Sequence, residues 1–156
     1  MSQTPWDLSV GPVALAAELI DIPSVSGDEG LIADRVEATV REASHLEVIR
    51  HGNTVAARTT QGLDTRVIIA GHLDTVPVGG AGGARIDNGI LYGRGSVDMK
   101  SALASQLILA GTLQAPSVDV TWVFYDQEEV SADRNGLGHF ATAHPDWLAA
   151  DAAVLG

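Results

Sequence analysis

Residues 67–77 read VIIAGHLDTVP, a β-branched apolar run that ends in a histidine and then an aspartate. A short run of this kind, bounded by a glycine and a proline, is typical of a buried strand. His72 would then lie where the strand leaves the sheet, which is the usual position of ligands in open α/β folds. Asp74 is close enough to contact the second imidazole nitrogen, as a metal-binding histidine requires. His72 is therefore a candidate metal ligand, and Asp74 is its candidate orienting partner.

The composition indicates one globular domain with a substantial core. The chain has 156 residues, of which 46% are hydrophobic. It has no cysteine, so any metal site must use histidine and carboxylate ligands, which suit zinc, cobalt or manganese. The formal net charge of −11 disfavours binding to nucleic acid or to an anionic membrane surface. A small-molecule substrate is the expected partner.

Signals for export or membrane insertion are not visible in the sequence. Residues 1–7 read MSQTPWD and lack the basic and apolar regions of a secretory signal peptide. No apolar run approaches the roughly 20 residues that a membrane-spanning helix needs. We therefore expect a cytoplasmic protein.

The hydrophobic pattern predicts helices that alternate with strands. The segment 26–29, which reads SGDE, has the spacing of a capping box at the start of a helix. The predicted helices cover residues 12–20, 31–40, 98–113 and 135–143. The predicted strands cover residues 46–49, 53–57, 67–70, 84–86, 90–92, 118–125 and 152–155, and residues 79–83 form a glycine-rich loop. Strands that alternate with helices imply an α/β sandwich.

Two further segments carry candidate ligands. Residues 93–100 read GRGSVDMK, and Glu128-Glu129 follow the apolar run 118–125. Each segment has an ordinary structural explanation, since Asp98 precedes a predicted helix as a preferred N-cap and the acidic pair suits a solvated turn. Adjacent carboxylates repel each other, however, so such a pair beside a sheet costs stability unless a cation is present.

Together these segments supply what hydrolysis by a pair of metal ions requires. Such a reaction needs a neutral imidazole and several carboxylates as ligands, and one further carboxylate that stays unligated and moves protons. His72, Asp98 and Glu129 are the candidate ligands, and Glu128 is the candidate proton carrier. A binding module has no need of such a proton carrier, so the pattern favours a hydrolase.

The segments at 72–74, 93–100 and 128–129 resemble the signatures of the zinc-dependent aminoacylase, acetylornithine deacetylase and carboxypeptidase family. Residues 22–27, which read IPSVSG, are similar to the usual opening of that family. The resemblance covers essentially the whole chain. It implies an αβα sandwich with a mixed central sheet, the architecture of the catalytic domain of two-zinc exopeptidases.

Within the family, the phrases at 125–130, 135–138 and 144–151 resemble the bacterial desuccinylase branch. This resemblance implies a two-zinc amidohydrolase that cleaves N-succinyl-L,L-diaminopimelate to succinate and L,L-diaminopimelate, on the route to lysine and cell-wall precursors. Two alternatives stay open. One is a deacetylase or dipeptidase of the same family, and the other is a non-catalytic fragment that binds a metal without chemistry.

The resemblance also implies a role for each candidate residue. His72 would bind one zinc ion, oriented by Asp74, and Asp98 would bridge both ions, with a cis peptide bond after it. Glu129 would bind the second zinc ion, and Co²⁺ would serve as a substitute metal. Glu128 would act as the general base, taking a proton from the attacking water and passing it to the leaving amine.

Family members are much longer than this chain, so the resemblance implies that residues 1–156 are the N-terminal part of the catalytic domain. A further glutamate ligand, a distal histidine ligand and the dimerisation domain are expected outside these residues. The complete protein is expected to be a homodimer. Three ligands for two metal ions predict an inactive fragment. The missing strands also predict an exposed apolar sheet edge.

Overall fold

A five-stranded sheet forms the centre of the protein in the computed structural model, which describes residues 4–77, 79 and 83–156. Its strands lie in the order β1-β2-β6-β3-β7. They are β1 (Glu47–His51), β2 (Thr54–Arg58), β3 (Arg66–His72), β6 (Asp119–Tyr125) and β7 (Ala152–Leu155). β2 pairs antiparallel with β1 and β6, while β3 pairs in parallel with β6 and β7. The sheet is therefore mixed.

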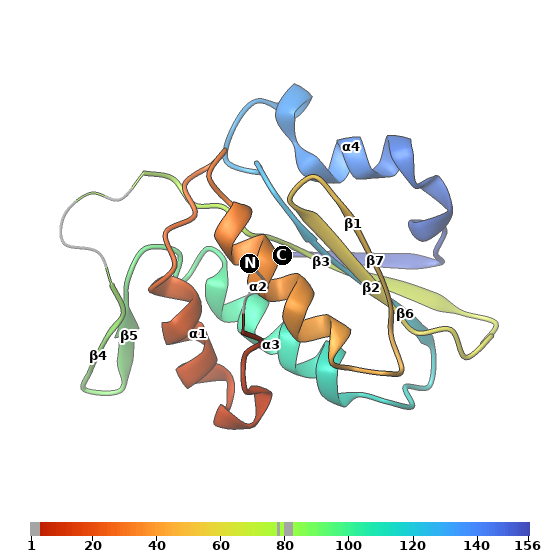
Figure 1. Ribbon diagram of the computed structural model, residues 1–156, viewed down its shortest axis with the longest axis horizontal. Helices are drawn as coiled ribbons and strands as arrows, with labels where there is room; N and C mark the ends of the chain where they lie inside the picture. Colours follow the sequence, from red (N-terminus) through yellow and green to blue (C-terminus); the bar gives the residue numbers. More distant parts are fainter. Residues whose placement is uncertain (1–3, 78, 80–82) are drawn as a thin grey trace.

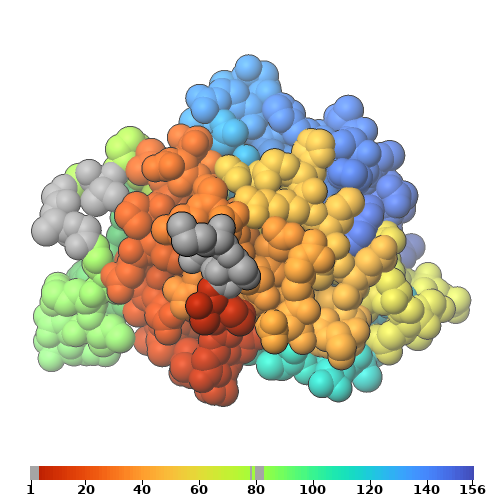
Figure 2. Space-filling model, in the orientation of Figure 1, coloured from red at the N-terminus to blue at the C-terminus, as the bar shows by residue number. Residues whose placement is uncertain are grey.

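Helices cover both faces of this sheet (Figure 1). They are α1 (Pro12–Ile20), α2 (Gly30–Arg41), α3 (Lys100–Thr112) and α4 (Gly136–Ala143), with 3-10 turns at Leu8–Val10, Ala132–Arg134 and Pro145–Trp147. α1, α2 and α3 pack on one face of the sheet, and α4 lies on the other. In Figure 2 the N-terminal segments cover the front of the molecule. The predicted αβα sandwich is confirmed. Within the described ranges, no helix combines the length and the apolar character needed to cross a bilayer.

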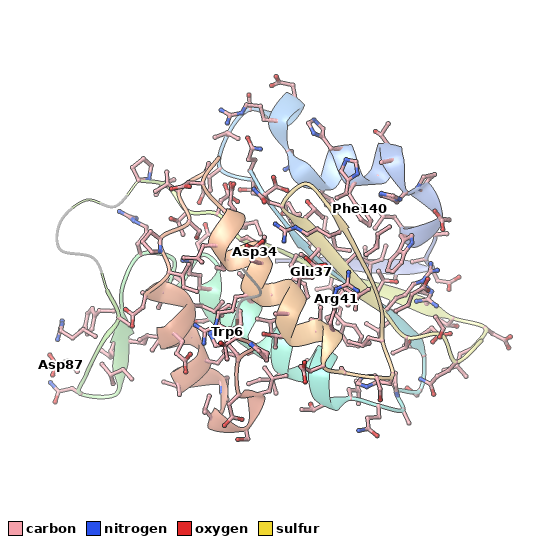
Figure 3. All side chains as sticks on the ribbon, viewed as in Figure 1. Trp6, Asp34, Glu37, Arg41, Asp87 and Phe140 are labelled. Atoms are coloured by element: carbon pink, nitrogen blue, oxygen red, sulfur yellow. The ribbon has the colours of Figure 1, made fainter. Side chains whose placement is uncertain are left out.

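The central strand β6 shows how one run of sequence serves two cores. All seven of its residues are buried, and successive side chains point to opposite faces because a strand repeats every two residues. Trp122 and Phe124 belong to the core under α1, α2 and α3, whereas Val123 and Tyr125 belong to the core under α4. Phe140 of α4 packs into that second core (Figure 3). A continuous apolar run is what such a doubly covered strand requires.

A two-stranded hairpin stands away from the main sheet (Figures 1 and 2). Its strands, β4 (Arg85–Asp87) and β5 (Ile90–Tyr92), are joined by Asn88 and Gly89, which have φ angles of 51° and 79°. A two-residue hairpin turn requires this left-handed conformation, which Asn-Gly adopts readily. Asp87 lies at the outer end of the hairpin (Figure 3). The predicted turn is confirmed.

The remaining predicted elements are confirmed to within two residues at their ends, but the predicted capping box is wrong. The Ser26 hydroxyl donates to the Asp74 carboxylate (2.6 Å) and does not cap α2. Glu29, the N-cap residue of α2, makes no side-chain cap hydrogen bond. The physical reason is that Asp74 is fully buried, and a buried carboxylate needs hydrogen-bond donors. The predicted loop at 79–83 lies largely outside the described residues.

β7 forms one border of the sheet. Among the described residues it pairs only with β3, and the residues Val154 and Leu155 are 59% and 62% exposed. The predicted exposed apolar edge is confirmed.

Asp119, the first residue of β6, is a buried carboxylate that stabilises this end of the strand. Asp119 accepts hydrogen bonds from the Thr59 hydroxyl (2.6 Å) and from the amides of Gln61, Gly62 and Leu63 (3.0 Å each). Burial raises the pKa of Asp119, but these hydrogen bonds outweigh burial and lower the pKa to about 2. Because this pKa lies below the ordinary value of 3.8, the ionised carboxylate stabilises the fold at higher pH, and this stabilisation is lost as the pH falls toward 2.

We expect Asp119→Asn to lower the free energy of unfolding by about 2 kcal/mol at pH 7, since one pKa unit corresponds to about 1.4 kcal/mol. The advantage of the wild type should shrink between about pH 4 and pH 2, as its carboxylate becomes protonated. Urea denaturation at a series of pH values measures both effects. Asp64→Asn, at an exposed position in the same loop, is the control and should change stability by less than about 0.5 kcal/mol. Equal stability of wild type and Asp119→Asn at pH 7 would contradict this assignment.

Candidate metal centre

The candidate site lies where β3 and β6 end. The two strands are parallel neighbours, and His72 is paired in register with Tyr125. The segments 73–75 and 126–129 therefore leave the sheet side by side. In Figure 1 they meet the loop between α1 and α2 at this end of the sheet. Asp98, just before α3, contributes a third segment.

Three predicted ligands come together at this point. His72, Asp98 and Glu129 each offer one ligand atom, and these atoms lie within 4.8 Å of one another. His72 Nε2 and Asp98 Oδ1 are 2.9 Å apart. His72 is buried, whereas the Asp98 side chain is 69% exposed. Asp98 and Glu129 line a cavity of about 270 Å³ together with the loop 93–97, so a cation can reach the donors from solvent.

The imidazole of His72 is oriented by Asp74. Its Nδ1 lies 3.0 Å from the Asp74 carbonyl oxygen and 3.4 Å from carboxylate Oδ1, so the backbone of Asp74 contributes as well as its side chain. A proton on Nδ1 directed at these oxygens leaves Nε2 free for a cation. Burial lowers the pKa of His72, but hydrogen bonds to Asp74 and Asp98 outweigh burial and raise the pKa to about 9. A cation at Nε2 therefore binds in competition with a proton.

The carboxylate of Asp74 joins the segments that carry the site. It is fully buried and accepts hydrogen bonds from the Ser26 hydroxyl (2.6 Å) and from the amides of Glu128 and Glu129 (3.0 Å each). Burial raises its pKa, but the contact with His72 and these hydrogen bonds outweigh burial and lower the pKa to about 2. Asp74 thus holds the loop after β6 against the end of β3.

Asp98 is available to a ligand because it does not cap α3. The N-cap position belongs to Met99, and no side-chain cap hydrogen bond is present there. The capping explanation of Asp98 is therefore wrong, because its carboxylate lies against His72 instead. The Asp98–Met99 peptide is cis, as the resemblance implied.

Glu128 precedes Glu129 in the chain and does not belong to the cluster of three candidate ligands. It is exposed, while its backbone amide is held by Asp74. Burial raises the pKa of Tyr125 to about 12, and the charges of Glu128, Asp74 and Asp98 add to this effect. The Glu128 carboxylate therefore shares the electrostatic environment of the site. An unligated carboxylate in this position suits proton transfer.

Two serines that hold the site together were not predicted. Ser24 Oγ donates to the Leu73 carbonyl (2.8 Å), and the Thr75 amide donates to the Ser24 carbonyl (2.8 Å). Ser26 Oγ donates to Asp74, as described above. Their signal in the sequence is the pair of hydroxyl residues in the opening segment, where a helix-capping pattern fits equally well.

The donor set fits a divalent cation. One imidazole nitrogen and two carboxylate oxygens are ligands that zinc, cobalt and manganese accept, and the hydrogen bond that orients His72 is in place. Three protein ligands are the usual number for one catalytic zinc ion, so they are too few for two. The structure thus brings the three predicted ligands together, while their roles at individual metal ions stay predictions.

The family described as peptidase family M20/M25/M40 matches residues 68–155, a range that contains all three candidate ligands. The chain belongs to this family. The resemblance drawn from the three signature segments is therefore confirmed.

Two relatives that are about half identical to this chain over the aligned residues carry a desuccinylase name. A Mycobacterium tuberculosis protein named putative succinyl-diaminopimelate desuccinylase DapE is 53% identical over 151 residues, which cover 96% of this chain and 43% of that protein. The succinyl-diaminopimelate desuccinylase of Corynebacterium glutamicum is 47% identical over 155 residues, covering 96% of this chain and 42% of that protein. The chain therefore spans less than half the length of these relatives.

Solved M20 and other peptidase structures share the fold. An M20 family metallo-carboxypeptidase from Sulfolobus solfataricus matches with a TM-score of 0.77 at 20% identity, over 92% of this chain and 36% of that one. The aminopeptidase PepT from Bacillus cereus matches with a TM-score of 0.72 at 18% identity, over 92% of this chain and 42% of that one. The predicted likeness to exopeptidase catalytic domains is confirmed at the level of the fold.

We expect His72→Ala to weaken Zn²⁺ binding by at least about 100-fold, because even partners outside the ligand shell are worth about 10- to 100-fold in affinity. Isothermal titration calorimetry with Zn²⁺ measures this loss. His139→Ala, which removes an exposed imidazole from α4, is the matched control and should leave the affinity unchanged. Equal weakening by both substitutions would mean that Zn²⁺ binds to surface histidines and not at the predicted ligands.

Proposed function

We propose that this chain supplies the N-terminal, metal-binding part of the catalytic domain of a two-zinc amidohydrolase. The proposed reaction is cleavage of N-succinyl-L,L-diaminopimelate to succinate and L,L-diaminopimelate, in lysine biosynthesis. The observation that carries the proposal is the convergence of His72, Asp98 and Glu129, with Glu128 next to Glu129 in the chain and outside the cluster. The names of the mycobacterial and corynebacterial relatives support the choice of substrate.

Each residue of the site has a defined task in this proposal. Zinc, when bound, lowers the pKa of water toward about 7 and polarises the amide carbonyl. His72 presents Nε2 as a ligand while Asp74 holds the imidazole ring through its other nitrogen, Nδ1. Asp98 and Glu129 supply carboxylate oxygens from the cavity wall. Glu128 accepts a proton from the attacking water and delivers it to the leaving amine nitrogen.

The remaining parts of the enzyme are proposed to lie in sequence that these 156 residues do not include. Three ligands are too few for two zinc ions, and the chain matches only 43% of its mycobacterial relative. We propose that the missing part of the relative's length corresponds to further ligands and to a dimerisation domain. On this proposal the chain alone binds a cation without turnover, and the complete protein is a cytoplasmic homodimer.

Two other functions use the same site. A deacetylase or dipeptidase would keep the ligands and the base and differ in substrate. A metal-binding module without chemistry would keep the ligands alone, and the unligated Glu128 beside them argues against it. An assay of turnover distinguishes them, because the first alternative predicts turnover of a different substrate and the second predicts none.

A chimera tests the proposal, in which residues 1–156 replace the matching segment of the Mycobacterium tuberculosis relative. We expect the zinc-loaded chimera to release succinate from N-succinyl-L,L-diaminopimelate with a higher kcat/KM than it releases acetate from N-acetylornithine. Glu128→Gln should lower kcat by about 10²- to 10⁴-fold, because general-base catalysis is worth about that much. Zinc affinity should change little, since Glu128 is not one of the proposed ligands. Steady-state kinetics and zinc titration measure these quantities.

The parent relative is the positive control for the assay, and Glu42→Gln is the matched control substitution at the exposed C-cap of α2. Glu42→Gln should leave kcat unchanged. Preference for the acetylated substrate would replace the desuccinylase assignment with a deacetylase. An active parent with an inactive chimera would favour the non-catalytic alternative, and loss of zinc from Glu128→Gln would make Glu128 a ligand.

A further inference from the structure

The loop between α1 and α2 contacts both segments that carry the metal centre. Val25 forms an isolated parallel bridge with Thr75, and the Ser26 amide donates to the Thr75 carbonyl (3.2 Å). At the end of the same loop, the Glu29 side chain accepts a hydrogen bond from Gln127, which lies 98 residues further along the chain. The proposed mechanism gives Glu29 no task.

Glu29 is a carboxylate in a costly position. It has no exposed surface. Oε1 accepts hydrogen bonds from the amides of Gly27 (2.7 Å) and Gln127 (3.3 Å), whereas Oε2 is buried without a hydrogen-bond partner among the described residues. A buried polar atom left unpaired lowers stability. An apolar side chain would avoid that cost, so the acceptor Oε1 is the feature that needs an explanation.

Glu29 and Asp74 together accept three consecutive backbone amides. The amide of Gln127 donates to Glu29, and those of Glu128 and Glu129 donate to Asp74. Gln127 has a φ of 57°, a left-handed conformation that is uncommon for a residue other than glycine. A backbone in this conformation persists only where its surroundings hold it. The two buried carboxylates provide that constraint at the point where the chain enters the Glu128-Glu129 pair.

We propose that Glu29 is a positioning residue, which fixes the Gln127 turn through its amide and thereby sets the direction of Glu128 and Glu129. Without Glu29, Asp74 would still accept the amides of Glu128 and Glu129, but the Gln127 amide would have no acceptor. The effect on Glu128 as a base rests on the proposed function. The effect on Glu129 as a metal ligand does not require turnover, so it can be measured separately.

Two substitutions distinguish the effect of the hydrogen-bond acceptor from the effect of side-chain size. Glu29→Gln keeps an oxygen for the Gly27 and Gln127 amides, whereas Glu29→Leu removes the acceptor and keeps an apolar group of similar size. Asp119→Asn is the matched control, because it weakens a buried carboxylate that also accepts consecutive loop amides, but at the opposite end of β6. Global destabilisation alone would therefore appear in the control as well.

The experiment uses this chain with bound Co²⁺ as the probe. Amide hydrogen exchange by NMR reports on residues 127–129, and the visible absorption spectrum of Co²⁺ reports on its ligand geometry. In Glu29→Leu we expect exchange at 127–129 to accelerate about 10- to 100-fold relative to the β3 and β6 amides, because the Gln127 amide loses its acceptor. The Co²⁺ spectrum should change, and Co²⁺ affinity should fall by about 10- to 100-fold. Glu29→Gln should stay within about threefold of wild type in both measurements, since its acceptor is retained.

Two outcomes would overturn the proposal. The first is a uniform acceleration of exchange in Glu29→Leu with an unchanged Co²⁺ spectrum, matching Asp119→Asn, which would make Glu29 structural only. The second is a Glu29→Gln variant as impaired as Glu29→Leu, which would show that an acceptor is not what matters. If Glu29→Leu does not fold, Glu29→Asp, which withdraws the acceptor by one methylene, takes its place. An inactive chimera would count against the proposed function and not against these results.

Discussion

The geometry of the site depends on one buried charge, the carboxylate of Asp74. It has no exposed surface, and a charge in such a place is tolerated only where donors surround it. Its donors come from segments far apart in sequence: the Ser26 hydroxyl in the loop before α2, and the Glu128 and Glu129 amides after β6. The backbone of the same residue orients His72. Because one residue contacts all of these partners, the candidate ligands His72 in β3 and Glu129 after β6 cannot move independently.

A second buried charge fixes the third segment of the site. Lys100, the first residue of α3, is only 2% exposed, and its Nζ donates to the carbonyls of Leu19 (3.0 Å) and Ile22 (2.7 Å) at the end of α1. A buried ammonium group that donates to two carbonyl oxygens in the core anchors the start of the helix firmly. Asp98 lies two residues earlier, so its position relative to His72 follows from the packing of α3 on α1. The contacts that pack α3 on α1 therefore also fix where Asp98 lies in the site.

The sequence predicted the elements well, and it named the three residues that the structure brings together, because both depend on local patterns. β6 was predicted from its continuous apolar run, and the hairpin turn from Asn88-Gly89. The contacts of Ser26 and Glu29 were missed because their partners lie 48 and 98 residues away, while a local capping pattern explained the same letters. Asp98 was ambiguous for a related reason, since the residue type that caps a helix is also a metal ligand. The parallel register of β3 on β6, the bridge of Val25 to Thr75 and the packing of α3 on α1 bring these distant residues together.

The residues of the site range from buried and hydrogen-bonded on one side to exposed on the other. His72 and Asp74 are fixed by burial and hydrogen bonds, whereas the Asp98 side chain is 69% exposed and Glu129 lines the open cavity. Several carboxylates gathered at one place repel one another, and a cation removes that repulsion as it binds. Cation binding at these residues would stabilise the fold, since the unfolded chain does not bring them together. At this site His72 would hold a cation from the buried side, and Asp98 and Glu129 would supply carboxylate oxygens from the exposed side.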